Sequence, residues 1–385
     1  MKRNHYDADH EAYRDTVREF LAREVEPHHE RWEEQRLVDR SAWLAAGKSG
    51  IIGLAVPEEF GGSGVTDYRF RQVVAEEVAR TATTSFGAGI ALQDDIVIPY
   101  LLHLGTEEQK QRWLPGMAAG ELIGAIAMTE PGAGSDLQGV KTTAVRDGDE
   151  WVINGQKTFI SNGIQADVVI VVCRTDPEAG SKGFSLIVVE DGTSGFGRGR
   201  KLHKVGLAAQ DTAELVFEDV RVPAGNLLGG EGRGFLHLME NLPLERIAMS
   251  VSGITAARAA YEWTKQYVFE RKAFGKQIGD LQNTRFVLAE MLTEIEVTES
   301  HVDRCVLALG AGELTAVDAS KAKWWATELQ KRVVDRCVQL HGGYGYMMEY
   351  PIARSYTDTR IQTIYGGTTE VMKEIIGRDI AAEFR

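Results

Sequence analysis

The sequence predicts a mainly α protein with a central β domain. Helical spacing of apolar residues dominates residues 9–120 and returns after Gly234, whereas short β-rich runs bounded by Gly, Asp and Pro fill the stretch between them. We therefore expect three domains, which a chain of 385 residues can hold. They are an N-terminal helical domain over 1–121, a middle β domain over 122–230 and a C-terminal helical domain over 231–385.

The N-terminal part carries four helical signals. The first predicted helix, Asp9–Glu24, has its apolar residues on one face, namely Tyr13, Val17, Phe20 and Leu21. Further helices are predicted over Tyr68–Arg80, Phe86–Leu104 and Glu107–Met117. Thr106 directly precedes the last of these and is suited to cap it.

The middle part reads as an antiparallel β domain. The apolar run Leu122–Met128 predicts a buried strand, and Asp147-Gly148 predicts a hairpin turn between two β-rich runs. The remaining predicted strands are Asp167–Cys173, Phe184–Val189 and Ala213–Phe217. No helical segments alternate with these strands, so a parallel dinucleotide-binding sheet is not expected.

Three long helices follow, and each carries an apolar stripe. The first stripe is Ile247, Val251, Ile254, Tyr261 and Val268; the second is Val287, Met291, Ile295, Val302 and Leu309; the third helix is Lys321–Leu340. These helices are apolar enough to form a bundle. Their length leaves surface that the β domain of one chain cannot cover, which indicates oligomerisation.

Composition and absent motifs exclude several functions. A net charge of −13 argues against nucleic acid and anionic membranes as partners. The three cysteines lie far apart and the nine histidines show no metal-ligand spacing, so we expect neither a disulfide framework nor a metal site. The sequence has no P-loop, no G-x-G-x-x-G, no H-E-x-x-H and no G-x-S-x-G. The charged N-terminus predicts no signal peptide and no membrane insertion, so we expect a cytoplasmic protein.

Two segments of the β domain could carry chemistry. In Met128–Asp136, two glycines and small neighbours would let backbone N–H groups converge on an anion or carbonyl, although a tight strand-exit turn explains the same residues. In Lys157–Gly163, Phe159 and Ser161 are two apart and would face one side of a strand. They could stack on a planar ring, but taken alone the segment favours a half-buried strand end with an Asn-Gly turn.

In this order and spacing, both segments resemble the acyl-CoA dehydrogenase family. The likeness continues with ERKAFG at 270–275, QLHGG at 339–343 and IYGGTTE at 364–370, and it covers residues 8–380. Within the family, KLHK at 201–204 and AQDTAEL at 209–215 are most similar to the long-chain acyl-CoA dehydrogenases.

The resemblance implies a middle β-barrel-like domain, a C-terminal four-helix bundle, bound FAD and a homotetramer built as a dimer of dimers. It implies flavin contacts in the same subunit from Ile126, Ala127, Met128, Thr129, Gly134, Ser135, Phe159, Ile160, Ser161, Thr368, Thr369 and Glu370. It implies contacts to the cofactor of a neighbouring subunit from Arg271, Phe274, Gln282, Gln339, Leu340, His341, Gly342 and Gly343. A guanidinium such as that of Arg271 pairs well with a pyrophosphate.

The implied reaction converts an acyl-CoA to a trans-2-enoyl-CoA. A carboxylate takes the α-proton, the β-hydrogen passes as hydride to flavin N5, and electrons go on to an electron-transfer flavoprotein. Many relatives keep the base where this chain has Gly366, but the long-chain and isovaleryl branches carry it on an earlier helix. The matching motif is LPLERI at 242–247, so Glu245 is the expected base.

Two other interpretations of these carboxylates are open. Pro243 fits a first helical position, which would make Glu245 a first-turn residue favoured by the helix dipole. Glu370 is the rival carboxylate, although the motif assigns it to the flavin. Gly366 would leave room for a carboxylate from the opposite wall.

The remaining implied contacts concern the substrate. They are Ser135, Ser181, Lys182, Leu236, Pro243, Leu244, Arg246, Gly366 and Gly367. We expect the floor of the acyl pocket within residues 86–103, but the sequence does not say which side chains point inward. A medium- or long-chain or branched fatty acyl-CoA is expected. A sterol side chain, a carrier-bound acyl group, a flavin oxidase or monooxygenase on this fold, and a scaffold without cofactor are the alternatives.

Overall fold

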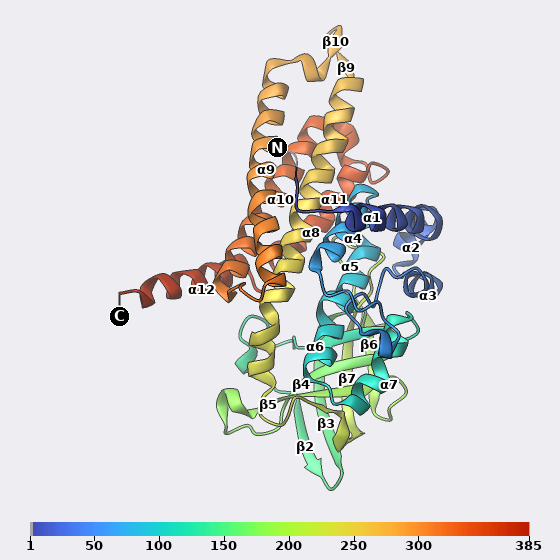
Figure 1. Cartoon of the computed structure of the whole chain (residues 1–385), viewed down its shortest axis with the longest axis vertical. Coiled ribbons are helices and arrows are strands. Elements are labelled where there is room, and N and C mark those ends of the chain that lie inside the picture. The colour runs from blue at the N-terminus through green and yellow to red at the C-terminus, as the bar shows by residue number, and fades with distance from the viewer. Residues whose placement is uncertain (1–2, 385) are drawn as a thin grey trace.

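The computed structural model describes residues 3–384. Helices at both ends of the chain lie side by side, the sheet lies below them, and the last helix projects to one side (Figure 1). The N-terminal helices are α1 Ala8–Phe20, α2 Glu26–Gln35, α3 Arg40–Lys48, α4 Tyr68–Arg80, α5 Thr84–Ala91, α6 Ile98–Leu104 and α7 Glu107–Ala118. Thr106 caps α7 in a capping box, as expected.

Two π-helical turns interrupt the helices that the sequence predicts as continuous. Leu21–Val25 joins α1 to α2, and Leu92–Val97 joins α5 to α6. A π turn adds a residue to the helical repeat and so rotates the faces that follow it. The expected helix Phe86–Leu104 is therefore one rod with a change of phase in the middle.

The middle domain is an eight-stranded sheet in the order β6-β7-β3-β2-β4-β5-β8, with β1 paired to β4. The strands are β1 Gly124–Ala127, β2 Thr143–Asp147, β3 Glu150–Ser161, β4 Val168–Arg174, β5 Phe184–Glu190, β6 Phe196–Lys201, β7 Thr212–Pro223 and β8 Leu227–Leu228. The purely antiparallel, barrel-like expectation is wrong in two respects. β1 and β2 run parallel to β4, which their long connections permit, and the sheet is open between β6 and β8 within the described residues.

The C-terminal helices are α8 Gly234–Glu270, α9 Gln282–Gly310, α10 Ala316–His341, α11 Pro351–Thr359 and α12 Thr369–Ala382. A two-stranded ribbon, β9 Lys272–Ala273 and β10 Lys276–Gln277, caps the far end of α8 (Figure 1). The predicted stripes on α8 and α9 form one apolar core with α10. α12 packs on α10 but projects away from the other helices, so a regular four-helix bundle is not confirmed within one chain.

The three parts of the chain meet at the N-terminal half of α8. α4 packs along α8, and the π turn Leu92–Val97 contacts both α8 and β1. The strand ends of the sheet therefore face the helices at this junction. No helix among residues 3–384 is long and apolar enough to cross a membrane.

Candidate active site

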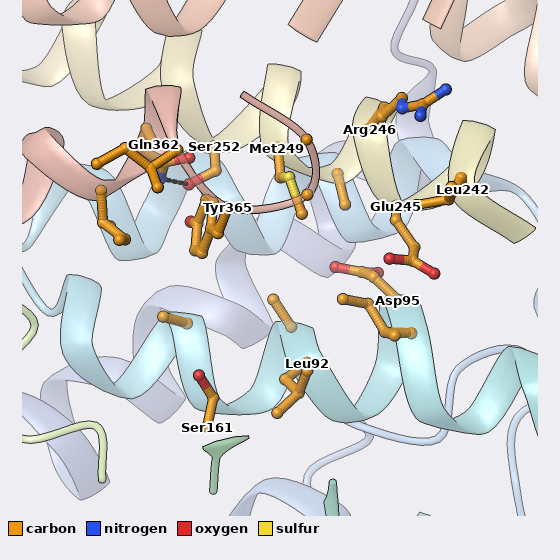
Figure 2. Close-up of a pocket in the computed structure, with 18 of the residues that line it drawn as sticks. Leu92, Asp95, Ser161, Leu242, Glu245, Arg246, Met249, Ser252, Gln362 and Tyr365 are labelled. Carbon is orange, nitrogen blue, oxygen red and sulfur yellow. Dashed lines mark hydrogen bonds between the residues drawn. The ribbon is translucent and has the colours of Figure 1, made fainter. Parts of the chain in front are cut away.

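A large cavity lies where the three parts meet, with a volume of about 1400 Å³. Its walls come from α4, α5, α8, the ends of β1 and β3, and the loop before α12 (Figure 2). Pockets for one drug-sized ligand usually have roughly 300–1,000 Å³. The cavity can therefore hold more than one such group.

The strand-exit loop 128–136 is held at its first residues by a buried ion pair. Lys157 is wholly buried, and its Nζ donates to Glu130 Oε1 at 2.9 Å, to the Met128 carbonyl at 3.1 Å and to the Val172 carbonyl at 2.8 Å. Glu130 also accepts from the backbone N–H of Thr142 at 2.9 Å. These contacts fix the start of the loop. Further along it, Gly134 faces open space, since a Cβ built on it would meet no atom within 4 Å.

Phe159 lines the cavity in a conformation that a side chain rarely adopts. Its φ is +60°, and the pairing of β3 with β7 shifts register between Lys157 and Ile160. The bulge turns the Phe159 ring outward, where it is 67% exposed, and Ser161 also lines the cavity. Phe159 and Ser161 therefore share a side of the strand, as predicted. An apolar ring exposed on a cavity wall is suited to cover a planar group.

Glu245 projects into the cavity from the middle of a helix. α8 begins at Gly234, so Pro243 lies inside it and the first-turn capping role for Glu245 is wrong. The Glu245 side chain is 2% exposed, and the wholly buried Tyr100 donates its hydroxyl to Oε1 at 3.0 Å. Burial raises the pKa of Glu245 to about 7, although the Tyr100 hydrogen bond and the charge of Arg246 act the other way. The carboxylate is thus a stronger base than an exposed glutamate.

Glu370 and Arg246 also line this cavity, and neither is placed to act as the base. Glu370 is exposed in the first turn of α12, and backbone hydrogen bonding lowers its pKa, so it makes a weak base. Arg246 is buried, but its guanidinium points away from the Glu245 carboxylate (Figure 2). It donates only to Ser320 Oγ at 3.4 Å, and its Nε has no partner among the described residues.

The Gly366-Gly367 turn faces α8 across the cavity. Both residues have positive φ, and a Cβ on Gly366 would lie 2.2 Å from Met249 Sδ. The space beside Gly366 is therefore filled by Met249, one turn after Glu245, rather than by the carboxylate. The buried Lys323 holds the turn from behind, since its Nζ donates to the Gly367 carbonyl at 2.6 Å.

A second cavity of about 530 Å³ lies at the other end of α8. Arg271 and the segment 339–343 line it, as do Tyr267 and Tyr344. At 1.5 Å per residue, Arg271 lies about 39 Å along the helix from Glu245. The two groups of predicted cofactor residues are therefore far apart in one chain.

The structure brings most of the predicted site residues together in these two cavities. The large cavity is lined by Ile126, Met128, Thr129, Gly134, Ser135, Phe159, Ile160, Ser161, Glu245, Arg246, Gly366, Gly367, Thr368 and Glu370. The second is lined by Arg271, Gln339, Leu340, His341, Gly342 and Gly343. Neither is lined by Ala127, Ser181, Lys182, Leu236, Pro243, Leu244, Phe274, Gln282 or Thr369. Of these, Phe274 is 92% exposed at the tip of the β9–β10 ribbon.

Sequence reasoning missed several residues that shape the site. Tyr100, the hydrogen-bond partner of Glu245, lies in a predicted helix, but nothing in the sequence links positions so far apart. Met249 could have been found, because it is four residues after Glu245 and shares its helix face. Tyr68, Arg71 and Asp95 add a polar group to the cavity wall.

Comparison with known proteins supplies the family. Models of the acyl-CoA dehydrogenase N-terminal, middle and C-terminal domains match residues 7–121, 125–220 and 232–381. The chain belongs to the acyl-CoA dehydrogenase family. The mitochondrial long-chain specific acyl-CoA dehydrogenase of Sus scrofa is 51% identical over 97% of this chain and 87% of that protein.

Solved structures of the acyl-CoA dehydrogenase family agree with this fold. An acyl-CoA dehydrogenase from Geobacillus kaustophilus superposes with a TM-score of 0.96 at 50% identity, covering 98% of this chain and all of that one. A Mycobacterium smegmatis glutaryl-CoA dehydrogenase in complex with FADH2 gives a TM-score of 0.91 at 29% identity, covering 98% and 96%. The chain is accordingly an acyl-CoA dehydrogenase, a flavoprotein oxidoreductase of fatty acid oxidation.

Proposed function

We propose that this enzyme oxidises a saturated fatty acyl-CoA to the trans-2-enoyl-CoA with Glu245 as the base that removes the α-proton. The observation that carries the proposal is the buried Glu245 carboxylate, which faces a cavity large enough for cofactor and acyl chain together. Removal of a weakly acidic α-proton needs a base whose pKa lies near the working pH. A pKa of about 7 meets this requirement.

The surroundings of Glu245 favour proton removal in two ways. The Tyr100 hydroxyl, held at 3.0 Å, fixes the direction of the carboxylate and leaves its other oxygen free to meet the substrate. Leu242, Met249 and Leu92 line the adjoining cavity walls (Figure 2). An acyl chain lying against these apolar residues would exclude water, which strengthens the charge interactions inside.

The residues of the large cavity fit FAD. The exposed Phe159 ring offers a face to an aromatic system. The open space beside Gly134 leaves the backbone of that loop accessible to a cofactor. Ser135, Ser161 and Thr368 add hydroxyl groups on the same walls. Bound FAD would supply the two-electron acceptor of the reaction.

Small side chains favour a medium- or long-chain or branched acyl group. Between α4 and α5 the cavity is lined by Ala75, Ala79, Gly87, Ala88 and Ala91. Such residues leave room for a hydrocarbon chain that Leu or Phe would block. The long-chain specificity in the name of the Sus scrofa relative agrees with this proposal.

We further propose that two subunits share each cofactor in a homotetramer. The Arg271 cavity lies about 39 Å from Glu245 along α8, too far to reach the flavin site of its own chain. A guanidinium there suits the pyrophosphate of a cofactor held by a neighbour. Electrons then pass to an electron-transfer flavoprotein. A cytoplasmic location stays a prediction, since the Sus scrofa relative is mitochondrial by name.

Anaerobic titration of the purified protein with acyl-CoAs of graded chain length tests the proposal. We expect a yellow protein whose flavin absorbance bleaches on mixing, with the strongest bleaching from medium or long chains. Oxygen consumption is measured in parallel. A protein that ignores every acyl-CoA, or that turns over only with oxygen and forms peroxide, contradicts the proposed reaction.

A further inference from the structure

One wall of the cavity carries a buried ion pair that the proposed reaction does not use. Arg71 on α4 donates from Nε to Asp95 Oδ1 at 2.8 Å and from Nη2 to Asp95 Oδ2 at 3.2 Å. Arg71 is 9% exposed and Asp95 6%, and both line the large cavity. Tyr68 also lines the cavity, and burial, followed by the negative charge of Asp95, raises the pKa of its hydroxyl. The neighbouring lining residues, Val74 and Ile96, are apolar.

Stability alone gives little reason for an ion pair in this wall. Replacing a buried pair with packed apolar residues is often neutral or stabilising, because desolvation offsets the attraction. Part of the cluster does anchor the chain: Arg71 Nη1 donates to the Ile51 carbonyl at 3.2 Å, and the neighbouring Asp94 accepts from the Gly53 N–H at 2.8 Å. Asp94, however, does not line the cavity, whereas Asp95 does. The anchoring contacts therefore leave the Arg71–Asp95 pair facing the space that the acyl chain would fill.

The ion pair is linked to the base through the rod that carries both Asp95 and Tyr100. Asp95 is five residues before Tyr100 on the same rod, so the two side chains sit on successive turns. Tyr100 contacts Glu245, and the carboxylates of Asp95 and Glu245 face the same part of the cavity (Figure 2). A group bound by Asp95 would thus lie on the part of the cavity wall that adjoins the base.

The cluster has donor and acceptor positions that its own members do not use. Arg71 occupies two of the roughly four lone-pair positions of the Asp95 carboxylate. Nη2 of Arg71 carries two N–H groups, and the described contacts use one of them. Acceptor positions on Asp95 and one donor on Arg71 are left, and an alkyl chain can satisfy neither. A hydroxyl group, which both donates and accepts, satisfies both.

We propose that Tyr68, Arg71 and Asp95 form a polar subsite that binds a hydroxyl group on the acyl chain. The substrates of the enzyme then include hydroxyacyl-CoA thioesters whose hydroxyl reaches this part of the cavity wall. The inference rests on the proposed function, because it assumes that the acyl chain runs through this cavity.

The test compares kcat/KM for dodecanoyl-CoA with kcat/KM for a series of its monohydroxy isomers. In the wild type, at least one isomer with the hydroxyl near the thioester should react as well as dodecanoyl-CoA or better. In the double variant Arg71→Met/Asp95→Leu, the wall becomes apolar. The kcat/KM for the preferred hydroxy isomer, divided by the kcat/KM for dodecanoyl-CoA, should then fall roughly a hundredfold. Turnover of dodecanoyl-CoA should persist.

Two further variants complete the design. Asp94→Asn is a control for the anchoring contacts. Asp94 does not line the cavity, and Asn keeps an oxygen for the Gly53 N–H and for Arg71 Nη1, which lies 3.6 Å from Asp94 Oδ2; the ratio of the two kcat/KM values should therefore stay close to that of the wild type. Tyr68→Phe removes one hydroxyl with little change of shape, so it carries the test if the double variant does not fold. It should lower the ratio several-fold.

The outcomes separate the subsite from the proposed function. The wild type could oxidise dodecanoyl-CoA and yet react with every hydroxy isomer as poorly as the variants do. That result overturns the subsite but not the proposed function. The same ratio in wild type, Tyr68→Phe and the double variant also overturns the subsite. A wild type that oxidises no acyl-CoA overturns the proposed function and the subsite with it.

Discussion

At the residue scale, the site depends on one carboxylate held away from water. Replacing Glu245 with Gln keeps the shape and the Tyr100 hydrogen bond but removes the base. We expect turnover to fall by roughly a hundredfold or more, while the flavin content is unchanged. Rapid-mixing measurement of flavin bleaching with a long-chain acyl-CoA checks this. Glu240→Gln is the control, since Glu240 is exposed on the same helix; near-normal bleaching by Glu245→Gln would contradict its role.

The pH dependence of the chemical step follows from the raised pKa of Glu245. The ionised form is the base, so the rate of flavin reduction should rise with pH and level off above about 7. Tyr100→Phe removes a hydrogen bond that favours the ionised form. The pKa of Glu245 should then increase, and the rising limb should move to higher pH. An unchanged profile in Tyr100→Phe would mean that another group controls this limb.

The same shift affects stability. Between the ordinary pKa of 4.5 and the folded value of about 7, the folded protein binds a proton at Glu245 that the unfolded chain has lost. The contribution of Glu245 to stability is therefore present below pH 4.5 and is lost as the pH rises through 7. As the pH rises between those values, the free energy of unfolding of the wild type should fall by up to roughly 3 kcal/mol relative to that of Glu245→Gln. Denaturant unfolding of both proteins at several pH values measures this difference.

At the element scale, the ion pair of Lys157 and Glu130 fixes the loop that leaves β1. Lys157→Met leaves the Glu130 carboxylate buried without its cation and should destabilise the protein by about 3–5 kcal/mol. The loop should also bind FAD less tightly, because the Met128 carbonyl loses its donor. Urea unfolding and FAD titration of the apoprotein measure the two effects. Lys157→Met/Glu130→Gln, which has no unpaired charge, should recover part of the stability but not the FAD affinity.

How far the sequence predicts these elements depends on the range of the interactions. The hairpin at Asp147-Gly148, the cap at Thr106 and the stripes on α8 and α9 are local patterns, and the structure contains them. The orientation of the sheet is not local, because the partner of β1 lies far along the chain. The repeat of 3.6 residues also fails across Leu92–Val97, where the π turn changes the phase. Spacing alone therefore could not show that Asp95, rather than Asp94, faces the cavity.

The candidate site shows the same limit. The position of Glu245 was predicted from the motif and its place on a helix, yet its first-turn alternative could be excluded only once α8 was seen to begin at Gly234. The Tyr100 contact and the burial of Lys157 depend on packing between distant segments. Most of the residues predicted from the sequence thus line one of the two cavities, but the sequence did not show the contacts that adjust their chemistry.

At the scale of the whole molecule, α8 separates two parts of one proposed cofactor site. Loss of the guanidinium in Arg271→Ala should therefore weaken FAD binding although Arg271 is far from Glu245 in its own chain. Dilution should release FAD as the assembly dissociates. Light scattering together with flavin fluorescence across a concentration series tests both statements. A monomer that retains FAD at full occupancy would contradict the shared site.

The length of α8 also has a genetic consequence. If each site takes Glu245 from one chain and Arg271 from its neighbour, the variants Glu245→Gln and Arg271→Ala damage different partners of the same site. In a mixed pair, one site then carries both defects, while the other receives an intact Glu245 and an intact Arg271. Two impaired proteins, unfolded and refolded together, should therefore complement each other and show more activity than either has alone.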